Sequence, residues 1–268
     1  MRCFVSENDA SRFGILELDI QAERAHFLDQ HVKALRNTGL ERVIAPNNGL
    51  IDLVTTGDII GFDVDIAKQM ARAMGVELKI VNTAWDGIIP ALLTDKFDIV
   101  MAGMTITPQR NLQVNFAEPY MVIGQSVLIR SGLEGKVSTY RDLNSDEYTI
   151  VTKLGTTGEI AARRYLSRAK ILTFESESEA ALEVRNGRAD AFVYDFPYNA
   201  IYLGENPEGL AHLDEPFTYE PLGWAVRKGD PDFLNWLDNF LRQIRGDGTY
   251  DALYKRWFES TRWMKDVN

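Results

Sequence analysis

The sequence predicts an α/β fold in which short buried strands alternate with amphipathic helices. The apolar run Ile99 to Ala102, bounded by Gly103, is typical of a buried strand. Two helical patterns precede it, each with a capping residue at its start, and a further strand precedes each helix. The order strand, helix, strand, helix, strand favours right-handed βαβ units around a parallel sheet, whose ligands bind beyond the carboxyl ends of the strands.

The length of the chain limits the number of domains, and its net charge limits the kinds of partner. The 268 residues suffice for one large or two modest domains, and 45% of them are hydrophobic, as in ordinary globular proteins. Lys and Arg number 29 against 39 Asp and Glu, so the formal net charge is −10. An acidic surface argues against nucleic acid or an anionic membrane as the main partner, because both attract basic patches.

Cysteine content and hydropathy indicate in which cellular compartments the protein could reside. Cys3 is alone, so no disulfide within the chain is expected, which suits cytosol or periplasm. No apolar run reaches the ~18–20 residues of a membrane span. The N-terminus lacks an uninterrupted apolar segment and a cleavage site, so we expect no signal peptide in this chain.

The first 40 residues are expected to form a helical or poorly ordered extension. A helix is predicted over 20–35, with Gly39 beyond its end. His26 and His31 are five residues apart, so they are not neighbours on one helix face, and we expect neither a metal site nor a cofactor. A strand at 42–45 and a turn at 46–49 follow.

The next segment predicts the first lobe of the fold. We expect Asp63 to cap a helix over 64–74 that ends at Gly75, and residues 76–81 to form a strand. Asp86 is expected to cap the following helix, with Pro90 in its first turn. Trp85 lies just before that cap, where it either contacts a ligand or packs on the helix as a hydrophobic staple.

The segment after the buried strand has the features of a carboxylate site. Thr107 is a good N-cap and Pro108 a good first helical residue, which places Arg110 in the first turn of a short helix. Free backbone N–H groups and the guanidinium both favour an anion. The alternative is an exposed arginine at a helix start.

The second half of the chain repeats the α/β pattern. After a strand at 148–152, residues 153–159 form a Gly- and Thr-rich turn into a helix at 160–167, a second anion-receptive site that lacks the Lys-Ser/Thr end of a nucleotide-binding P-loop. Asp195 follows a strand at 189–194 and either caps the next helix or contacts a ligand. A return strand at 222–227 and two terminal helices at 231–245 and 249–257 complete the prediction.

Five ordered motifs resemble the amino-acid-binding, family 3 solute-binding proteins of bacterial ABC importers. The resemblance covers residues 60–258 and rests on GMTITPQR with FAEPY, GFDVDIAKQMARAMGV, WDGIIPALLTDKFDIVMAG, ADAFVYDFPYN and DGTYDALYKRWF. It implies a two-lobed periplasmic-binding-protein-like fold of type II, with two strand crossovers as a hinge. Lobe 1 would comprise residues 41–122 and 222–268, and lobe 2 residues 123–221.

The resemblance also implies a site and its roles. The implied ligand-binding residues are Trp85, Gly103, Thr105, Arg110, Lys153, Thr156, Thr157 and Asp195. Residues 42–55 depart from the family, because the usual Pro-Phe pair is missing. Asp52 is a candidate ligand contact there, and an acidic contact would favour a basic amino acid.

The expected function is that of a non-catalytic, monomeric periplasmic protein. It would bind a free, polar or basic amino acid by hinge closure and deliver it to an ABC permease in the inner membrane. One alternative is an enzyme similar to cyclohexadienyl dehydratase, which would need a general acid or base in the cleft. Another is the ligand-sensing domain of a receptor.

Overall fold

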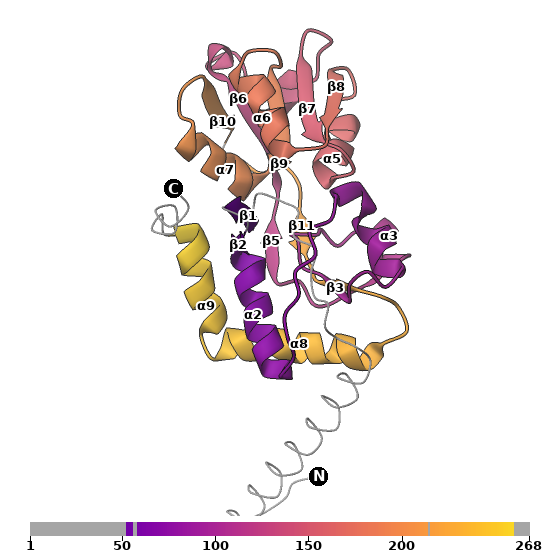
Figure 1. Ribbon diagram of the computed structural model, residues 1–268. Coiled ribbons are helices and arrows are strands. Elements are labelled where there is room, and N and C mark those ends of the chain that lie inside the picture. Colours follow the sequence, from indigo (N-terminus) through magenta and orange to yellow (C-terminus); the bar gives the residue numbers. More distant parts are fainter. Residues whose placement is uncertain (1–51, 56–57, 214, 260–268) are drawn as a thin grey trace, which may run out of the picture.

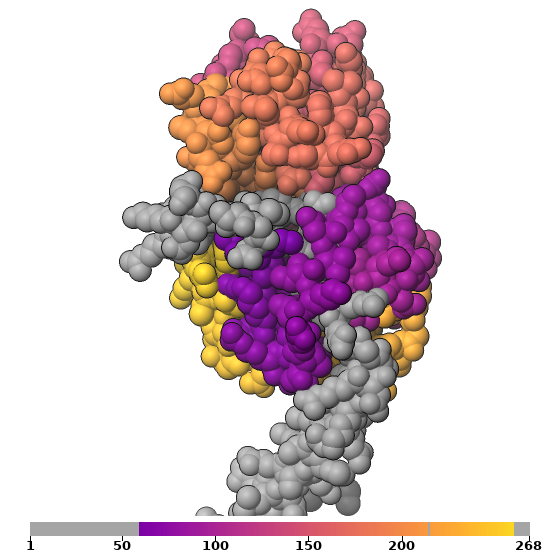
Figure 2. Space-filling view, in the orientation of Figure 1, coloured from indigo at the N-terminus to yellow at the C-terminus, as the bar shows by residue number. Residues whose placement is uncertain are grey.

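The chain folds into two α/β lobes joined by a pair of extended strands (Figure 1). The computed structural model describes residues 52–55, 58–213 and 215–259. In the space-filling view the lobes are distinct masses that meet along one side of a waist (Figure 2). The predicted extension at 1–40, the strand at 42–45 and the side chain of Asp52 lie outside the described residues.

One lobe is built on a five-stranded mixed sheet. Its strand order is β10 (Leu210–Leu213), β6 (Gln125–Arg130), β9 (Ala191–Asp195), β7 (Thr149–Lys153) and β8 (Lys170–Phe174). Strand β7 is parallel to β8 and β9, whereas β6 is antiparallel to β9 and β10. Helices pack against this sheet: α5 (Thr157–Tyr165), α6 (Glu177–Arg185) and α7 (Phe196–Glu205). Short 3₁₀ turns lie at Ser131–Leu133 and Tyr140–Leu143.

The other lobe combines both ends of the described chain. Its helices are α2 (Phe62–Met74), α3 (Ile88–Leu93), α4 (Pro108–Asn111), α8 (Pro231–Gly246) and α9 (Thr249–Tyr254). Its strands are the hairpin β1 (Asp52–Thr55) with β2 (Asp58–Gly61), and a sheet in which β12 (Ala225–Val226) lies between β3 (Ile99–Val100) and β4 (Asn115–Phe116). A 3₁₀ turn at Trp85–Gly87 precedes α3, and a π-helical turn at Lys255–Glu259 follows α9.

Two antiparallel strands connect the lobes, as predicted. Strand β5 (Met121–Ile123) leads out of one lobe and pairs with β11 (Glu220–Leu222), which leads back (Figure 1). The two segments approach closely at Gly124, where a Cβ atom would lie 2.5 Å from the carbonyl oxygen of Thr218. The hinge therefore requires glycine at this position for steric reasons.

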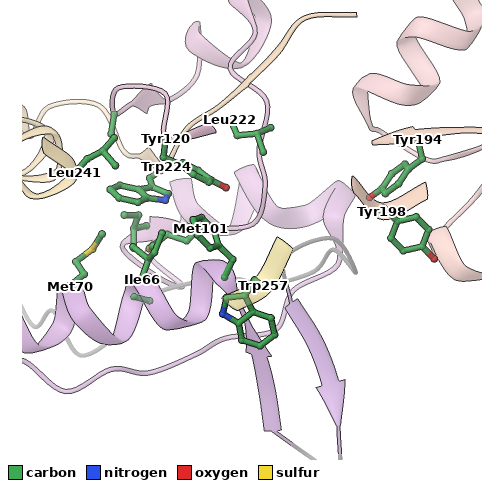
Figure 3. Close-up of a cluster of buried hydrophobic side chains, with 14 of the residues drawn as sticks. Ile66, Met70, Met101, Tyr120, Tyr194, Tyr198, Leu222, Trp224, Leu241 and Trp257 are labelled. Atoms are coloured by element: carbon green, nitrogen blue, oxygen red, sulfur yellow. The ribbon is translucent and has the colours of Figure 1, made fainter. Parts of the chain in front are cut away.

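The C-terminal elements cover the core of the lobe that holds α2. The predicted apolar face of α8 is buried, and it consists of Phe233, Leu237, Phe240, Leu241 and Ile244. Trp224 and Tyr120 stack with their ring centroids 5.4 Å apart, beside Ile66 and Met70 of α2 (Figure 3). This packing holds the start of β5 against the sheet and the terminal helices.

Several local predictions are wrong. Asp63 does not cap α2, because Gly61 occupies the cap position and the carboxylate is buried instead. Residues 76–81 alternate in exposure but have no ladder partner among the described residues, so they are not a strand. Asp86 lies within the 3₁₀ turn, and Gly87 precedes α3.

Other predictions need adjustment of position or pairing. The helix predicted at 160–167 begins earlier, at Thr157, because the side chain of Thr156 caps it. The parallel sheet predicted for the first lobe is wrong for its described strands, because β12 pairs with β3 and β4 in antiparallel fashion. The parallel pairs, β7 with β8 and with β9, lie in the five-stranded sheet. Gly75 ends α2 in the left-handed conformation, with φ 65°, as predicted. The exact lobe boundaries stay a prediction.

Candidate ligand-binding site

The predicted site residues converge where the two lobes touch. Thr105, after β3, and Thr157, at the start of α5, bring their hydroxyl oxygens within 3.4 Å of each other across the cleft. The indole Nε1 of Trp85 donates to the carbonyl oxygen of Gly155, at 3.0 Å. These contacts join the loop before α4 to the turn before α5, two segments far apart in the sequence.

Local structure around α4 aims Arg110 at this junction. Thr107 caps the helix by accepting from the backbone N–H of Arg110 at 3.2 Å, and Pro108 is the first helical residue, as predicted. The guanidinium Nη1 donates to the carbonyl oxygen of Thr105 at 2.8 Å, and the guanidinium carbon lies 5.3 Å from the centroid of the Trp85 ring. Burial lowers the pKa of Arg110, while the nearby carboxylates of Glu220 and Asp195 raise it.

The facing turn presents the N-terminus of α5. Gly155 has φ 72°, a conformation that favours glycine. The hydroxyl of Thr156 donates to the carbonyl oxygen of Lys153 at 2.7 Å and accepts from the N–H of Glu159 at 3.4 Å. This geometry fixes the first turn of α5, whose helix dipole favours an anion.

Asp195 ends β9 on the same side of the cleft. Its side chain does not cap α7, so the capping alternative is wrong. One carboxylate oxygen instead accepts from Nε2 of Gln125 at 2.6 Å, and the residue is 7% exposed. Burial, with a smaller contribution from the neighbouring Glu220, raises the pKa of Asp195 to about 7 against the opposing effects of Gln125, Arg110 and Lys153.

Two further residues belong to this site and were not predicted. Gln125 also donates to the hydroxyl of Thr157 at 3.3 Å, so it links Asp195 to the start of α5. Glu220 is 5% exposed and accepts from the hydroxyl of Thr218 at 2.9 Å. Gln125 follows Gly124 directly, and Glu220 begins the returning strand β11. The sequence signal that could have pointed to this part of the site was Gly124, a glycine inside a run that otherwise favours a strand.

Two predicted site residues have protein partners of their own. The ammonium of Lys153 is 2.7 Å from a carboxylate oxygen of Glu177, and the lysine is 1% exposed. The backbone N–H of Gly103 donates to the carboxylate of Asp63 at 3.0 Å. Lys153 therefore contributes a charge beneath the cleft, and Gly103 contributes the conformation of the loop.

A cleft of about 640 Å³ opens beside the Thr105–Thr157 contact. It lies between the two lobes and the hinge, with Glu220 among its lining residues. Within the described part of the chain, no group of three His, Cys, Asp or Glu side chains could hold a metal ion. The groups that the two lobes bring together here are charged side chains, hydroxyls and backbone amides.

A charged cleft between two hinged α/β lobes defines a solute-binding protein of the periplasmic type. This chain belongs to the bacterial extracellular solute-binding proteins, family 3, whose sequence pattern matches residues 44–260. The predicted family and the two-lobed fold are thereby confirmed. Among the described residues, no helix has the length and apolar character needed to span a bilayer.

Relatives of known structure share the fold over most of the chain. A binding component of an ABC transporter from Wolinella succinogenes, solved with lysine, is 53% identical, with a TM-score of 0.80 over 83% of this chain and 96% of its own. The ancestral amino-acid-binding protein AncCDT-1, a precursor of cyclohexadienyl dehydratase, is 46% identical, with a TM-score of 0.79 over 85% of this chain and 99% of its own.

A relative known from its sequence is also a binding protein by name. A probable histidine-binding protein of Neisseria gonorrhoeae is 36% identical over 211 residues, which is 77% of each chain. The prediction of a binding protein rather than an enzyme agrees with the names of these relatives. AncCDT-1 is described as a precursor of a dehydratase, which is the reason for testing the enzymatic alternative below.

Proposed function

We propose that this protein is the amino-acid-binding component of an ABC importer and that its ligand is a cationic amino acid. The observation that carries the proposal is the placement of Arg110 and Asp195. These opposite charges come from different lobes, and neither forms an ion pair with another described residue. A zwitterion bound between them would supply a counter-ion to each.

The proposed pose assigns one ligand group to each element. The α-carboxylate contacts the guanidinium of Arg110, the hydroxyl of Thr105 and the N-terminus of α5 at Thr156 and Thr157. The α-ammonium contacts Asp195, and its charge favours the ionised carboxylate despite the burial that raises the pKa. The ring of Trp85 forms a wall for the aliphatic part of the ligand.

The balance of charges supports a cationic side chain. The solvent-shielded groups around the proposed ligand contacts comprise two cations, Arg110 and Lys153, and three carboxylates, Asp195, Glu177 and Glu220. Arg164 also lines the cleft, but its side chain is exposed to solvent and is left out of this balance. A zwitterion adds no net charge, so one negative charge would remain inside a poorly solvated cleft. A lysine or arginine ligand would balance it. Names of relatives agree, since one is complexed with lysine and one is a probable histidine-binding protein.

The mechanism we infer is hinge closure about the β5–β11 pair. A ligand that contacts Arg110 in one lobe and Asp195 in the other is bound best when the lobes close, so it shifts the population toward the closed form. The moving bodies would be residues 41–122 with 222–268, and residues 123–221. A monomer in the periplasm would present this closed form to the permease.

Isothermal titration of the unfolded and refolded protein against the twenty amino acids and ornithine tests the proposal. Refolding removes any ligand retained from the source. We expect saturable binding of lysine, arginine or ornithine at micromolar or lower Kd. Absence of binding by every amino acid would refute the proposed ligand class.

The same experiment tests the enzymatic alternative. Asp195, a buried carboxyl near Arg110 whose pKa is raised to about 7, is the group best suited to act as a general acid there. Prephenate added to the refolded protein is expected to give no continuing heat flow and no new product. Steady turnover would instead assign a dehydratase activity.

A further inference from the structure

The carboxylate of Asp63 is buried in the lobe opposite Asp195 and is unused by the proposed recognition of the ligand. It is the second residue of α2 and is fully excluded from solvent. One carboxylate oxygen accepts two hydrogen bonds, from the backbone N–H of Gly103 at 3.0 Å and from the hydroxyl of Tyr120 at 2.9 Å. Burying a carboxylate this completely is costly, so its two long-range partners need an explanation.

The first partner begins the loop that leads to Arg110. Gly103 has φ 62°, and the chain continues from it to Thr105, whose carbonyl oxygen accepts from the Arg110 guanidinium. The hydrogen bond from the Gly103 N–H therefore fixes the start of this loop to α2. A shift here would be passed along two residues to the backbone oxygen that orients the guanidinium.

The second partner precedes the outgoing hinge strand. Tyr120 lies directly before β5, and its backbone N–H donates to the carbonyl oxygen of Leu222 in β11 at 2.9 Å. Its ring stacks on Trp224 (Figure 3). Its carbonyl oxygen accepts from the hydroxyl of Tyr250 at 2.7 Å. The backbone and the ring of Tyr120 are therefore both fixed by neighbouring residues, so its hydroxyl has a defined position for the hydrogen bond to Asp63 at the base of the hinge.

We propose that Asp63 is a positioning residue, which ties the Arg110-bearing loop to the root of the hinge through Gly103 and Tyr120. The inference rests on the proposed binding function and adds a residue that acts on affinity without touching the ligand. A single charged acceptor shared by two neutral donors sets the distance between them. Charge-assisted hydrogen bonds are short and strong enough for this role.

Asp63→Asn tests the proposal because it preserves shape and removes the charge. One of the two donors would then face a weaker acceptor or the amide nitrogen. Asp65→Asn is the matched control, since Asp65 lies on the same helix and accepts from the indole of Trp257 at 3.1 Å, away from the loop. Two quantities are measured on each folded variant: the Kd for L-lysine and the exchange rate of the Gly103 amide.

We expect Asp63→Asn to raise the Kd about tenfold and to accelerate exchange of the Gly103 amide, because one buried charge-assisted bond is lost. Asp65→Asn should change neither. In the Arg110→Lys background the effect of Asp63→Asn on Kd should shrink, since both act on the same guanidinium contact. A merely structural role would lower the melting temperature and leave this coupling at zero.

Unchanged Kd and unchanged Gly103 exchange in Asp63→Asn would overturn the inference. If Asp63→Asn does not fold, Tyr120→Phe, which keeps the stacked ring and removes the hydroxyl, is measured in its place with the same expectations in weaker form. Failure of wild-type protein to bind L-lysine would count against the proposed ligand, whereas the Gly103 exchange rate would still decide on the positioning role.

Discussion

Asp195→Asn should stabilise the ligand-free protein at high pH while removing ligand binding. Burial raises the pKa of Asp195 from 3.8 to about 7, so the folded protein holds this proton more tightly than the unfolded chain does. The wild-type protein therefore loses stability as the pH rises from about 4 to about 7. Asparagine cannot ionise, and its side-chain oxygen can still accept the 2.6 Å hydrogen bond from Gln125.

The size of the effect follows from the pKa. Raising the pKa of Asp195 by about three units corresponds to roughly 4 kcal/mol of lost stability once the carboxyl is fully ionised. About two of those units lie above pH 5, so the advantage of the variant over wild type should grow by roughly 2–3 kcal/mol between pH 5 and pH 8.

Urea unfolding of refolded, ligand-free protein at pH 5 and pH 8 measures this difference. The exposed Asp146→Asn serves as the matched control, and its free energy of unfolding should track wild type at both pH values. Titration with lysine at pH 8 should find no binding by Asp195→Asn. A stability difference that stays constant between the two pH values, or a variant less stable at pH 8, would refute the reasoning.

Three further substitutions probe the site and the hinge. Arg110→Ala should weaken amino-acid binding tenfold or more, because the ligand carboxylate loses its charge partner, while the exposed Arg163→Ala should bind normally in the same titration. Trp85→Phe keeps the aromatic wall but removes the indole N–H that donates across the cleft. We expect about threefold to tenfold weaker ligand binding and, in X-ray scattering, a larger radius of gyration for the ligand-free protein. An unchanged radius of gyration would argue against this contact. Gly124→Ala should lower the free energy of unfolding in urea by about 1–3 kcal/mol, because the new Cβ would lie 2.5 Å from a carbonyl oxygen. Gly204→Ala, where the new Cβ meets open space in helix α7, should raise the free energy of unfolding by about 0.5–1 kcal/mol. Equal effects of the two glycine substitutions would contradict the hinge geometry.

The parts of the site that local chemistry dictates could be predicted from the sequence. Thr107 and Pro108 have strong positional preferences at a helix start, so the place of Arg110 in the first turn of α4 followed from them. Asp195 was placed correctly at the end of its strand. Each of these predictions needs only neighbours within a few residues.

The parts that depend on distant contacts could not be predicted. Asp63 has the sequence context of a helix cap, and only Gly103 and Tyr120, 40 and 57 residues away, explain why its carboxylate is buried. Glu220 looks like a polar residue in a return strand, and its proximity to Arg110 arises from the pairing of β11 with β5. Alternation at 76–81 predicts a strand, but a strand also needs a neighbour to pair with.

The measurement that tests the central claim most directly is titration of the refolded protein with L-lysine and two truncated analogues. Cadaverine lacks the carboxylate assigned to Arg110, and 6-aminohexanoate lacks the α-ammonium assigned to Asp195. We predict saturable micromolar binding of L-lysine and at least tenfold weaker binding of each analogue, because each leaves one buried charge without its partner. Equal affinity for L-lysine and either analogue would contradict the proposed role of the corresponding residue.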